Sequence, residues 1–320
     1  MEYTLEYLGT EADRYLAELS YPTTAPGLFE PVKYTFETGG KRVRPAVCMA
    51  TYAALSGRDP HEIINQACAI EMFHNFTLLH DDVMDRAEVR RGRPTVHVKW
   101  DTASAILSGD AMLTLAYDMI ADGSGEHFAK IFRLFSKTAM EIYEGQQLDM
   151  EFESRSDVSV EEYMEMITLK TSVLIGCACR MGAELAGADA DTCRRFYDYG
   201  MLYGLSFQMR DDWLDTFGDP AVFGKEIGGD ILCDKKTWLR IMAEKEAPAE
   251  TAAAAAISNP VEKVEAMRSL YRSLGLDRLC DETARSFSNQ AKEAIASVSM
   301  PEAAREFFDN LALKACTRQK

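Results

Sequence analysis

The chain has 320 residues, 47% of them hydrophobic, which is enough to bury a sizeable core. Its 51 acidic and 35 basic side chains give a formal net charge of −16. A nucleic-acid partner is therefore not expected, because binding to a phosphate backbone requires a basic surface. Any site for a phosphate group must be a local basic patch in an acidic protein.

The eight cysteines are scattered and form no C-x-x-C pair, so neither a zinc ribbon nor a thioredoxin-type motif is present. Most of them lie in apolar stretches, as small core residues in a reducing compartment do. The N-terminal stretch MEYTLEYLGTEADRYLAELS carries acids and does not have the pattern of a signal peptide. No apolar run reaches the roughly 20 residues that a membrane span needs. These features predict a soluble, cytoplasmic protein with no membrane span.

Helical periodicity dominates the chain. Apolar residues recur three and four apart in residues 103–122, 128–150 and 269–298, which predicts helices there. Strand signals are poor, because there is no sustained alternation and no Asn-Gly hairpin. No Ser-rich or Gly-rich linker divides the chain. We therefore predict one all-α domain, residues 1–320, folded as a single large helical bundle.

The first motif in chain order is the basic stretch GGKRVRP. Its two glycines allow the backbone to turn and to approach a ligand closely. Lys41, Arg42 and Arg44 then supply three cations, and guanidinium groups suit phosphate oxygens. Taken alone, the stretch is also what a basic loop that balances the acid excess of the protein would contain.

Three acids follow in the motif DDVMD. On a helix, Asp81 and Asp85 lie one turn apart on the same face, and Asp82 flanks them. Such carboxylates repel one another unless a cation is bound, and all-oxygen ligands suit a hard ion such as Mg²⁺. A single motif of this kind is equally well explained by a solvated acidic helix face.

Histidines and arginines surround these acids. His74 lies on an apolar stretch seven residues earlier, where a core histidine is the usual outcome, although beside a phosphate it could donate a hydrogen bond. His80 directly precedes the acids and could be a neighbour of the metal ligands. Arg90 and Arg91 form a basic pair after the acids, and Arg93 is interpreted as a surface residue.

Further along, the motif TLKTSV places Lys170 and Thr171 in a helix, and Lys225 and Lys235 flank a Gly-Gly pair. Isolated lysines are usually solvated, so composition alone does not single them out.

A second D-D-x-x-D motif, in FQMRDDWLD, contains Asp211, Asp212 and Asp215. Two copies on separate predicted helices suggest carboxylates that face each other across a helical bundle, a known way to build a metal site. Because no Glu-x-x-His motif accompanies them, a di-iron centre is not indicated. Several Mg²⁺ ions that bridge a diphosphate fit these residues better.

Taken in order, the motifs resemble those of the trans-isoprenyl diphosphate synthases, also called polyprenyl synthetases. The matching stretches within residues 39–238 are GGKRVRP, HNFTLLHDDVMD, RRGRPT, SGDAML, EGQQLDM, LKTSVL, FQMRDDWLD, FGKEIGGDI and DKKTW. The resemblance implies an all-α fold of the isoprenoid synthase type around a deep central cavity, and a homodimer. It also implies a prenyltransferase that joins isopentenyl diphosphate to an allylic diphosphate.

The resemblance assigns roles to individual residues. Three Mg²⁺ ions, replaceable by Mn²⁺, would bind to Asp81, Asp82, Asp85, Asp211, Asp212 and Asp215. The residues that match positions on the allylic side are Arg90, Lys170, Thr171, Gln208, Lys225 and Lys235. The residues that match the isopentenyl diphosphate pocket are Lys41, Arg44, His74 and Arg91. The expected catalytic residues are Asp81, Asp82, Asp85, Arg90, Lys170, Asp211 and Lys225.

The resemblance also bears on product length. Phe76 lies five residues before the first aspartate motif, and Phe73 lies on the same helix face, so the two rings could form a floor below the metals. Ordinary core packing is the commoner role of phenylalanines at this spacing. An aromatic residue at the position of Phe76 accompanies short products in the family, whereas Thr77 departs from a double-aromatic pattern. Geranylgeranyl diphosphate is therefore the expected product, with farnesyl diphosphate as the second choice.

Other functions remain possible at this point. A terpene cyclase shares the fold but lacks the isopentenyl site, and GGKRVRP and DDWLD argue against it. A non-catalytic subunit of a heteromeric synthase would have lost one acidic cluster, and a helical metal-binding scaffold would not need the interleaved cations. The C-terminal residues Arg318 and Lys320 resemble a basic tail that closes over isopentenyl diphosphate in some relatives, although a frayed terminus has the same appearance.

Overall fold

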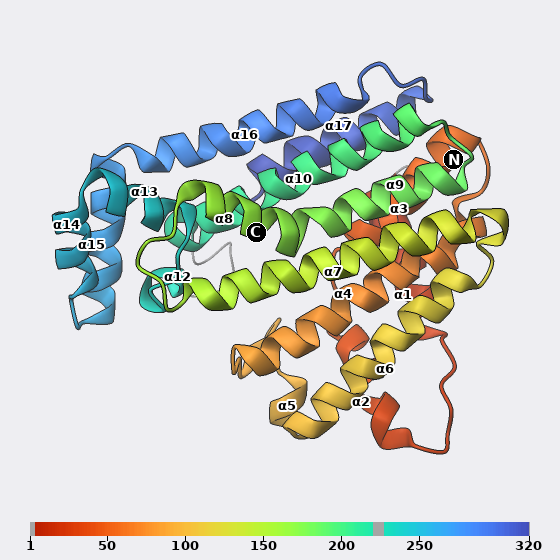
Figure 1. The fold of residues 1–320 in the computed structure, drawn as a ribbon, viewed down its shortest axis with the longest axis horizontal. Coiled ribbons are helices and arrows are strands. Elements are labelled where there is room, and N and C mark those ends of the chain that lie inside the picture. The colour runs from red at the N-terminus through yellow and green to blue at the C-terminus, as the bar shows by residue number, and fades with distance from the viewer. Residues whose placement is uncertain (1–3, 220–226, 320) are drawn as a thin grey trace. The chain divides into compact units, whose positions relative to one another are not determined.

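The structure is a computed structural model, and it describes residues 4–219 and 227–319. Within these residues the chain is almost entirely helical (Figure 1). The strands found there are β1 (Val89–Arg90) and β2 (Arg93–Pro94), which pair antiparallel. The prediction of an all-α fold is confirmed.

The internal contacts divide the chain into two compact units. Unit 1 comprises Met1–Ser136, Ala178–Arg194 and Ser299–Phe307. Unit 2 comprises Lys137–Cys177, Arg195–Val298 and Phe308–Lys320. The expectation of a single domain stays a prediction.

Unit 1 contains most of the N-terminal half of the chain. Its elements are α1 (Leu5–Ala17), α2 (Pro26–Glu37), α3 (Val43–Ser56), η1 (Pro60–Ile63), α4 (Ile64–Met84), β1, β2, α5 (Val96–Lys99), α6 (Thr102–Ala121), η2 (Gly125–His127) and the start of α7 (Phe128–Phe152). The end of α9 (Val173–Leu185), the start of α10 (Ala190–Phe217) and the start of α17 (Glu302–Thr317) also belong to it.

Unit 2 contains the remaining parts of these long helices. Its other elements are α8 (Val160–Ile167), the π-helical turn η3 (Thr168–Ser172), α12 (Gly229–Leu232), α13 (Trp238–Glu246), α14 (Pro248–Ala255), α15 (Pro260–Ser273) and α16 (Leu276–Ile295). Its core holds Tyr163, Met209, Trp238, Leu239, Met267 and Tyr271, all of them buried.

Helix α4 is the central helix of unit 1 and lies beside α6 (Figure 1). Its buried residues occur all around the helix, as expected for a helix enclosed by others. The two helices can approach closely because α6 has a glycine at the contact: a Cβ added to Gly109 would lie 2.2 Å from the His80 Nε2 atom. His80 reaches past this glycine to the carbonyl oxygen of Ile106, 3.0 Å away.

The predicted helical stretch 269–298 is interrupted. Gly275 has a φ of 71° and separates α15 from α16. Such a left-handed residue ends a helix, and glycine adopts it without steric cost. The apolar periodicity continues across the break, so periodicity by itself does not reveal it.

One continuous helical stretch, Val160–Leu185, is long and apolar enough to cross a membrane. However, 72% of its apolar window is buried inside the protein, as in the core helix of a globular domain. This stretch is therefore weak evidence for a membrane span. Seven of the eight cysteines are buried and Cys233 is exposed, which agrees with their interpretation as small core residues.

Candidate active site

The first aspartate cluster lies at the C-terminal end of α4 in unit 1. Asp81 and Asp82 are on its last turn, and Asp85 follows as the C-cap residue. Arg90 of β1 donates from Nε to Asp82 Oδ1 at 2.6 Å and from Nη2 to Asp81 Oδ2 at 3.3 Å. One guanidinium group therefore holds two of the three predicted metal ligands.

The three acids are not equivalent. Asp82 is buried, and burial raises the pKa of its carboxyl group although Arg90 opposes the shift. Asp85 is exposed, and its backbone N–H donates to the Asp81 carbonyl oxygen. The geometry thus turns Asp82 inward toward Arg90, while Asp81 and Asp85 are one helical turn apart.

The basic pair Arg90 and Arg91 lies in a short hairpin, with Arg90 at the end of β1 and Arg91 in the turn. Strands β1 and β2 are joined by Arg91 and Gly92, whose φ angles are 53° and 75°. Positive φ at both central residues is what a type I′ turn requires. This hairpin has no Asn-Gly signal, because arginine takes the first of the two turn positions instead of asparagine.

The predicted isopentenyl diphosphate residues gather beside the 38–44 segment of unit 1. Arg91 donates from Nη1 to the Gly39 carbonyl oxygen and lies 3.5 Å from Thr38 Oγ1. The pKa of His74 is well below its ordinary value, because of burial and the positive charges of Arg44 and Arg91. His74 is therefore a neutral ring among cations at pH 7, in an environment suited to an anion.

Arg42 does not share this role. It is buried, and its guanidinium group pairs with Asp13 and Glu71. The sequence pattern placed Arg42 among three cations that suit a phosphate, and the resemblance assigned only Lys41 and Arg44 to the pocket. The ion pairs of Arg42 lie within the protein, which separates it from those two. Lys41 is exposed and Arg44 is partly buried.

The interpretation of His80 also needs revision, whereas that of Arg93 does not. His80 contacts the Ile106 carbonyl oxygen on α6, with its ring nitrogen 3.9 Å from Asp110, so it supports helix packing rather than the aspartates. Arg93 is a surface residue, as interpreted from the sequence: its side chain is 39% exposed, pairs with the exposed Glu37 and lies over the ring of Tyr34.

In unit 2, the motif TLKTSV forms the π-helical turn η3, and such turns often occur at functional sites. Gly145 of α7 allows the close approach, since an added Cβ would lie 2.4 Å from the Lys170 backbone nitrogen. Lys170 Nζ donates to Asp149 Oδ2 at 2.6 Å, and Thr171 Oγ1 lies 3.4 Å from Gln208 Oε1. The structure therefore brings Lys170, Thr171 and Gln208 into one region.

The second aspartate cluster lies on α10. As in the first cluster, the middle aspartate, here Asp212, is the buried one. Asp212 is fully enclosed: it accepts hydrogen bonds from the Tyr163 hydroxyl and from Gln208 Nε2 at 3.2 Å. Burial, with the nearby charge of Asp230, raises the pKa of Asp212 to about 7. Asp212 is thus held by the protein, as Asp82 is in unit 1.

Asp215 and Asp211 have separate neighbours. Asp215 Oδ2 accepts from the backbone N–H of Asp230 at 3.0 Å, which fixes the start of α12. Asp211 pairs with Arg318, whose guanidinium carbon lies 3.7 Å from the centre of the Phe207 ring. Arg318 therefore lies beside the second cluster within unit 2.

Asp149 was not singled out from the sequence, although it lies within the quoted stretch EGQQLDM. It sits between two of the predicted allylic-side lysines, 2.6 Å from Lys170 Nζ and 4.0 Å from Lys235 Nζ. Burial would raise the pKa of Asp149, but Lys235 and Lys170 outweigh it and the pKa is lowered. It lies near the end of α7, three residues before Phe152, and nothing in the local sequence distinguished it from other helical acids.

Two predicted residues, Lys225 and Lys320, lie outside the described residues. Across residues 4–219 and 227–319, no three His, Cys, Asp or Glu side chains converge in a group that could hold a metal by itself. The two clusters belong to different units, so the prediction that they face each other stays a prediction.

The donor chemistry nevertheless fits a hard divalent cation. Mg²⁺ is usually held by one or two carboxylates, with phosphate oxygens and water as its other ligands, rather than by a cage of protein side chains. Asp81 and Asp85 offer such a pair on one helix face, and a cation, Arg90, already lies against Asp81. Metal ligation by these residues is therefore compatible with the structure.

The predicted floor residues are packed in an aromatic cluster of unit 1. Phe73 lies 5.4 Å from Phe76 and 5.2 Å from Phe135 of α7, measured between ring centres. Phe135 in turn lies 5.1 Å from Tyr117 of α6. Thr77 donates its hydroxyl proton to the His74 carbonyl oxygen on its own helix. The floor would therefore have a second tier, Phe135, that the local sequence does not reveal.

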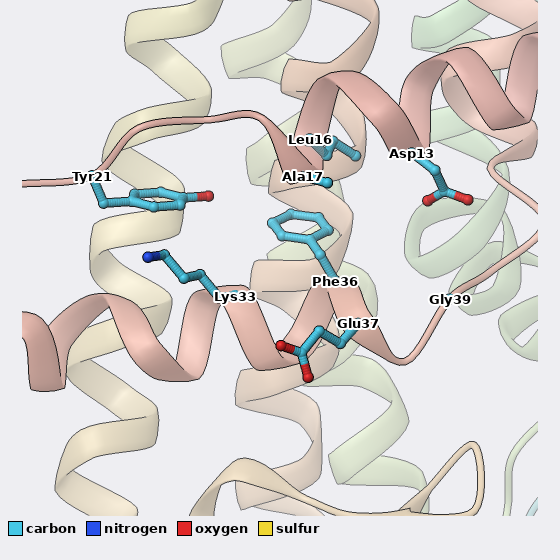
Figure 2. A pocket seen from close by; sticks show the side chains of 8 residues that line it. All are labelled: Asp13, Leu16, Ala17, Tyr21, Lys33, Phe36, Glu37 and Gly39. Carbon is cyan, nitrogen blue, oxygen red and sulfur yellow. The ribbon is translucent and has the colours of Figure 1, made fainter.

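A cavity of about 370 Å³ lies beside the 38–44 segment (Figure 2). Its walls are the end of α1, the following loop and α2, with the residues Asp13, Leu16, Ala17, Tyr21, Lys33, Phe36, Glu37 and Gly39. Tyr21 points into it, and burial raises the pKa of its hydroxyl group to about 12. The cavity gives solvent access to Asp13, one of the two acids that hold Arg42.

Comparison with known proteins identifies the family. A model of the family described as polyprenyl synthetase matches residues 25–274. The chain is 42% identical to a geranylgeranyl diphosphate synthase of Methanosarcina mazei, over 73% of this chain and 72% of that one. It is 43% identical to a geranylfarnesyl diphosphate synthase of Aeropyrum pernix, over 67% of this chain and 69% of that one.

The structure gives the same result. It is similar to a crystal structure of a geranylgeranyl pyrophosphate synthase, with a TM-score of 0.93, 40% identity and 99% of both chains covered. The chain belongs to the polyprenyl synthetase family, whose members have the all-α isoprenoid synthase fold. It is a prenyltransferase of the short-chain trans-isoprenyl diphosphate synthase type.

Proposed function

We propose that this enzyme condenses isopentenyl diphosphate with an allylic diphosphate to give geranylgeranyl diphosphate and free diphosphate. The observation that carries this proposal is the separation of charge along α4 of unit 1. A neutral His74 lies among Arg44 and Arg91, and the carboxylates Asp81 and Asp82 follow two turns later, held by Arg90. One helix thus offers a site for an anion and a site for a cation.

The first chemical requirement is to break the carbon–oxygen bond of the allylic diphosphate. Mg²⁺, when bound by the aspartates, would stabilise the negative charge of the leaving diphosphate. Arg90 and the lysines Lys170 and Lys235 would supply further positive charge to it. Thr171 and Gln208, 3.4 Å apart, would orient the same group by hydrogen bonds.

The second requirement is to hold isopentenyl diphosphate while its double bond attacks the allylic cation. Lys41, Arg44 and Arg91 would bind its diphosphate, with His74 as an uncharged neighbour. The proton lost after the attack goes to the released diphosphate, as in the family that the sequence resembles. The aromatic cluster would exclude water, which otherwise quenches the cation.

Product analysis tests the proposal. The purified enzyme is incubated with labelled isopentenyl diphosphate and dimethylallyl, geranyl or farnesyl diphosphate, and the dephosphorylated products are separated by chromatography. We expect a twenty-carbon product as the main species. A fifteen-carbon main product would contradict the chain length but not the reaction, and cyclic products without uptake of isopentenyl diphosphate would contradict the reaction.

The two diphosphate sites should respond to different substitutions. Lys41→Ala or Arg44→Ala should raise KM for isopentenyl diphosphate by about tenfold to a hundredfold, since each lost charge-assisted hydrogen bond costs about 1.5–3 kcal/mol. Lys170→Ala or Lys235→Ala should act mainly on KM for the allylic substrate. Steady-state kinetics with each substrate varied in turn measures this, and equal changes in both constants for all four variants would contradict the division of roles.

We also propose a cytoplasmic homodimer. In its support, the apolar side chains of Ile106 and Leu107 on α6 and of Phe128 and Phe132 on α7 are all exposed on unit 1. Exposed apolar side chains on neighbouring helices are typical of protein interfaces. Light scattering of the purified enzyme tests the homodimer, and the mass of a single chain would contradict it.

A further inference from the structure

Arg42 is the basic residue of the GGKRVRP motif that the proposed substrate-binding role does not use. Its backbone is in the left-handed region, with φ 45° and ψ 39°, and it forms the N-cap of α3. A non-glycine residue seldom adopts this conformation, and where it does, the surrounding structure usually enforces it.

All three nitrogens of the Arg42 guanidinium group are bound. Nε donates to Asp13 Oδ1 at 2.5 Å, and Nη1 donates to Glu71 Oε1 at 2.8 Å. Nη2 donates to the Phe36 carbonyl oxygen at 3.2 Å. These partners belong to α1, α4 and α2, so one side chain joins three helices to the start of a fourth.

The partner on α4 is itself held in place. Glu71 is buried, and its Oε1 also lies 3.2 Å from Asn75 Nδ2. Asn75 directly follows His74, the neutral ring of the proposed isopentenyl diphosphate pocket. Arg42 thus connects the 38–44 segment to the helix that carries His74.

The neighbouring glycines fit this arrangement. Gly39 has a φ of 70°, and a Cβ added to Gly40 would lie 3.2 Å from the Nη1 atoms of both Arg42 and Arg91. Two guanidinium groups therefore lie against Gly40. Burial alone would lower the pKa of Arg42, but the charges of Glu71 and Asp13 outweigh burial, so this pKa is raised. The pKa of Arg91 is lowered, because of burial and the positive charge of Arg42. The two carboxylates balance Arg42, which leaves Arg91 with the less compensated charge.

We propose that Arg42 is a positioning residue. Its bonds to Asp13 and Glu71 hold the 38–44 segment in the conformation that presents Lys41 and Arg44 to isopentenyl diphosphate. This inference rests on the proposed function, because it assigns the segment to that substrate. A role in fold stability alone is the competing explanation, and it predicts no difference between the two substrates.

The test starts from Asp13, because its side chain is 45% exposed and borders the cavity in Figure 2, so Asp13→Asn should fold normally. Arg42→Gln removes both ion pairs, and Arg42→Lys can keep one of them. The control is Glu11→Gln, on the same helix, which loses pairs with Arg14 and His61 that do not involve the segment.

Two measurements are made on each variant. Hydrogen exchange followed by mass spectrometry reports on the 38–44 amides, and steady-state kinetics reports KM for each substrate. For Asp13→Asn and Arg42→Gln we expect faster exchange confined to this segment and its contacts, with KM for isopentenyl diphosphate raised about tenfold. We expect kcat and KM for the allylic substrate to change less than about twofold, with an intermediate effect for Arg42→Lys and none for Glu11→Gln.

The result that overturns the inference is unchanged exchange at residues 38–44 in the folded variants, or faster exchange throughout with both KM values altered alike. A failure of the proposed function looks different. In that case the wild-type enzyme makes no condensation product and does not bind isopentenyl diphosphate in a calorimeter.

Discussion

Asp81→Ala and Asp211→Ala are each expected to lower kcat by about 10³-fold, because a group that stabilises charge in the transition state typically contributes 10²–10³ to the rate. The two residues lie in different units and have different neighbours, Arg90 for Asp81 and Arg318 for Asp211. A similar loss from both would therefore indicate a shared function, ligation of the ions that grip the allylic diphosphate. Both substitutions should leave KM for isopentenyl diphosphate nearly unchanged.

Metal dependence provides the second half of this test. The wild-type enzyme should lose all turnover in EDTA and regain it with Mg²⁺ or Mn²⁺. Calorimetric titration with Mg²⁺ and a non-reactive diphosphate should show weaker binding in both variants than in the wild-type enzyme. Asp118→Ala, which removes an exposed acid of α6, is the control and should keep its activity. Full turnover in EDTA would contradict a role for the metal.

Phe76→Ala should shift the product to longer chains. Phe76 lies five residues before Asp81, about 7.5 Å along the axis of α4 at 1.5 Å per residue. A chain that grows from the diphosphate along this helix would meet its ring first, and removal of the ring opens space for about one more isoprene unit. Phe73 and Phe135 remain below it, 5.2 Å apart, and should limit the extension.

Because the rings lie in tiers, we expect product length to increase with each ring that is removed. Phe76→Ala combined with Phe73→Ala should give longer products than Phe76→Ala alone, while Phe76→Tyr keeps the ring and should keep the product. Both alanine substitutions enlarge a buried space, and each costs about 3–5 kcal/mol of stability, so melting temperatures are measured in parallel. An active, folded Phe76→Ala enzyme with an unchanged product would show that the floor lies elsewhere.

The prediction of an all-α fold depended only on local information. Apolar spacing in residues 103–122 and 128–150 was sufficient for α6 and α7, because a helix buries one face and repeats every 3.6 residues. The family was equally accessible, since its motifs are short and contiguous. Even so, the break at Gly275 and the hairpin at Arg91 and Gly92 were not predicted, because each depends on a single backbone conformation rather than on periodicity.

Tertiary structure decided the roles of chemically similar residues. Lys41, Arg42 and Arg44 are three cations in four positions, and only the fold shows that Arg42 meets Asp13 and Glu71. In the same way, Asp81 and Asp82 are adjacent acids, and only the fold distinguishes them by burying Asp82 against Arg90. Asp149 lies on α7 and pairs with Lys170, which is 21 residues later in the sequence, so only the fold shows that the two meet.

The sequence by itself thus determined the helical class, the family and the residue types that the chemistry requires. These follow from interactions between near neighbours, which set helix periodicity and motif spacing. Which charge is buried, which is paired and which remains available for a substrate was decided by the tertiary structure. The physical reason is that desolvation and ion pairing depend on groups brought together from distant parts of the chain, and no local pattern records those neighbours.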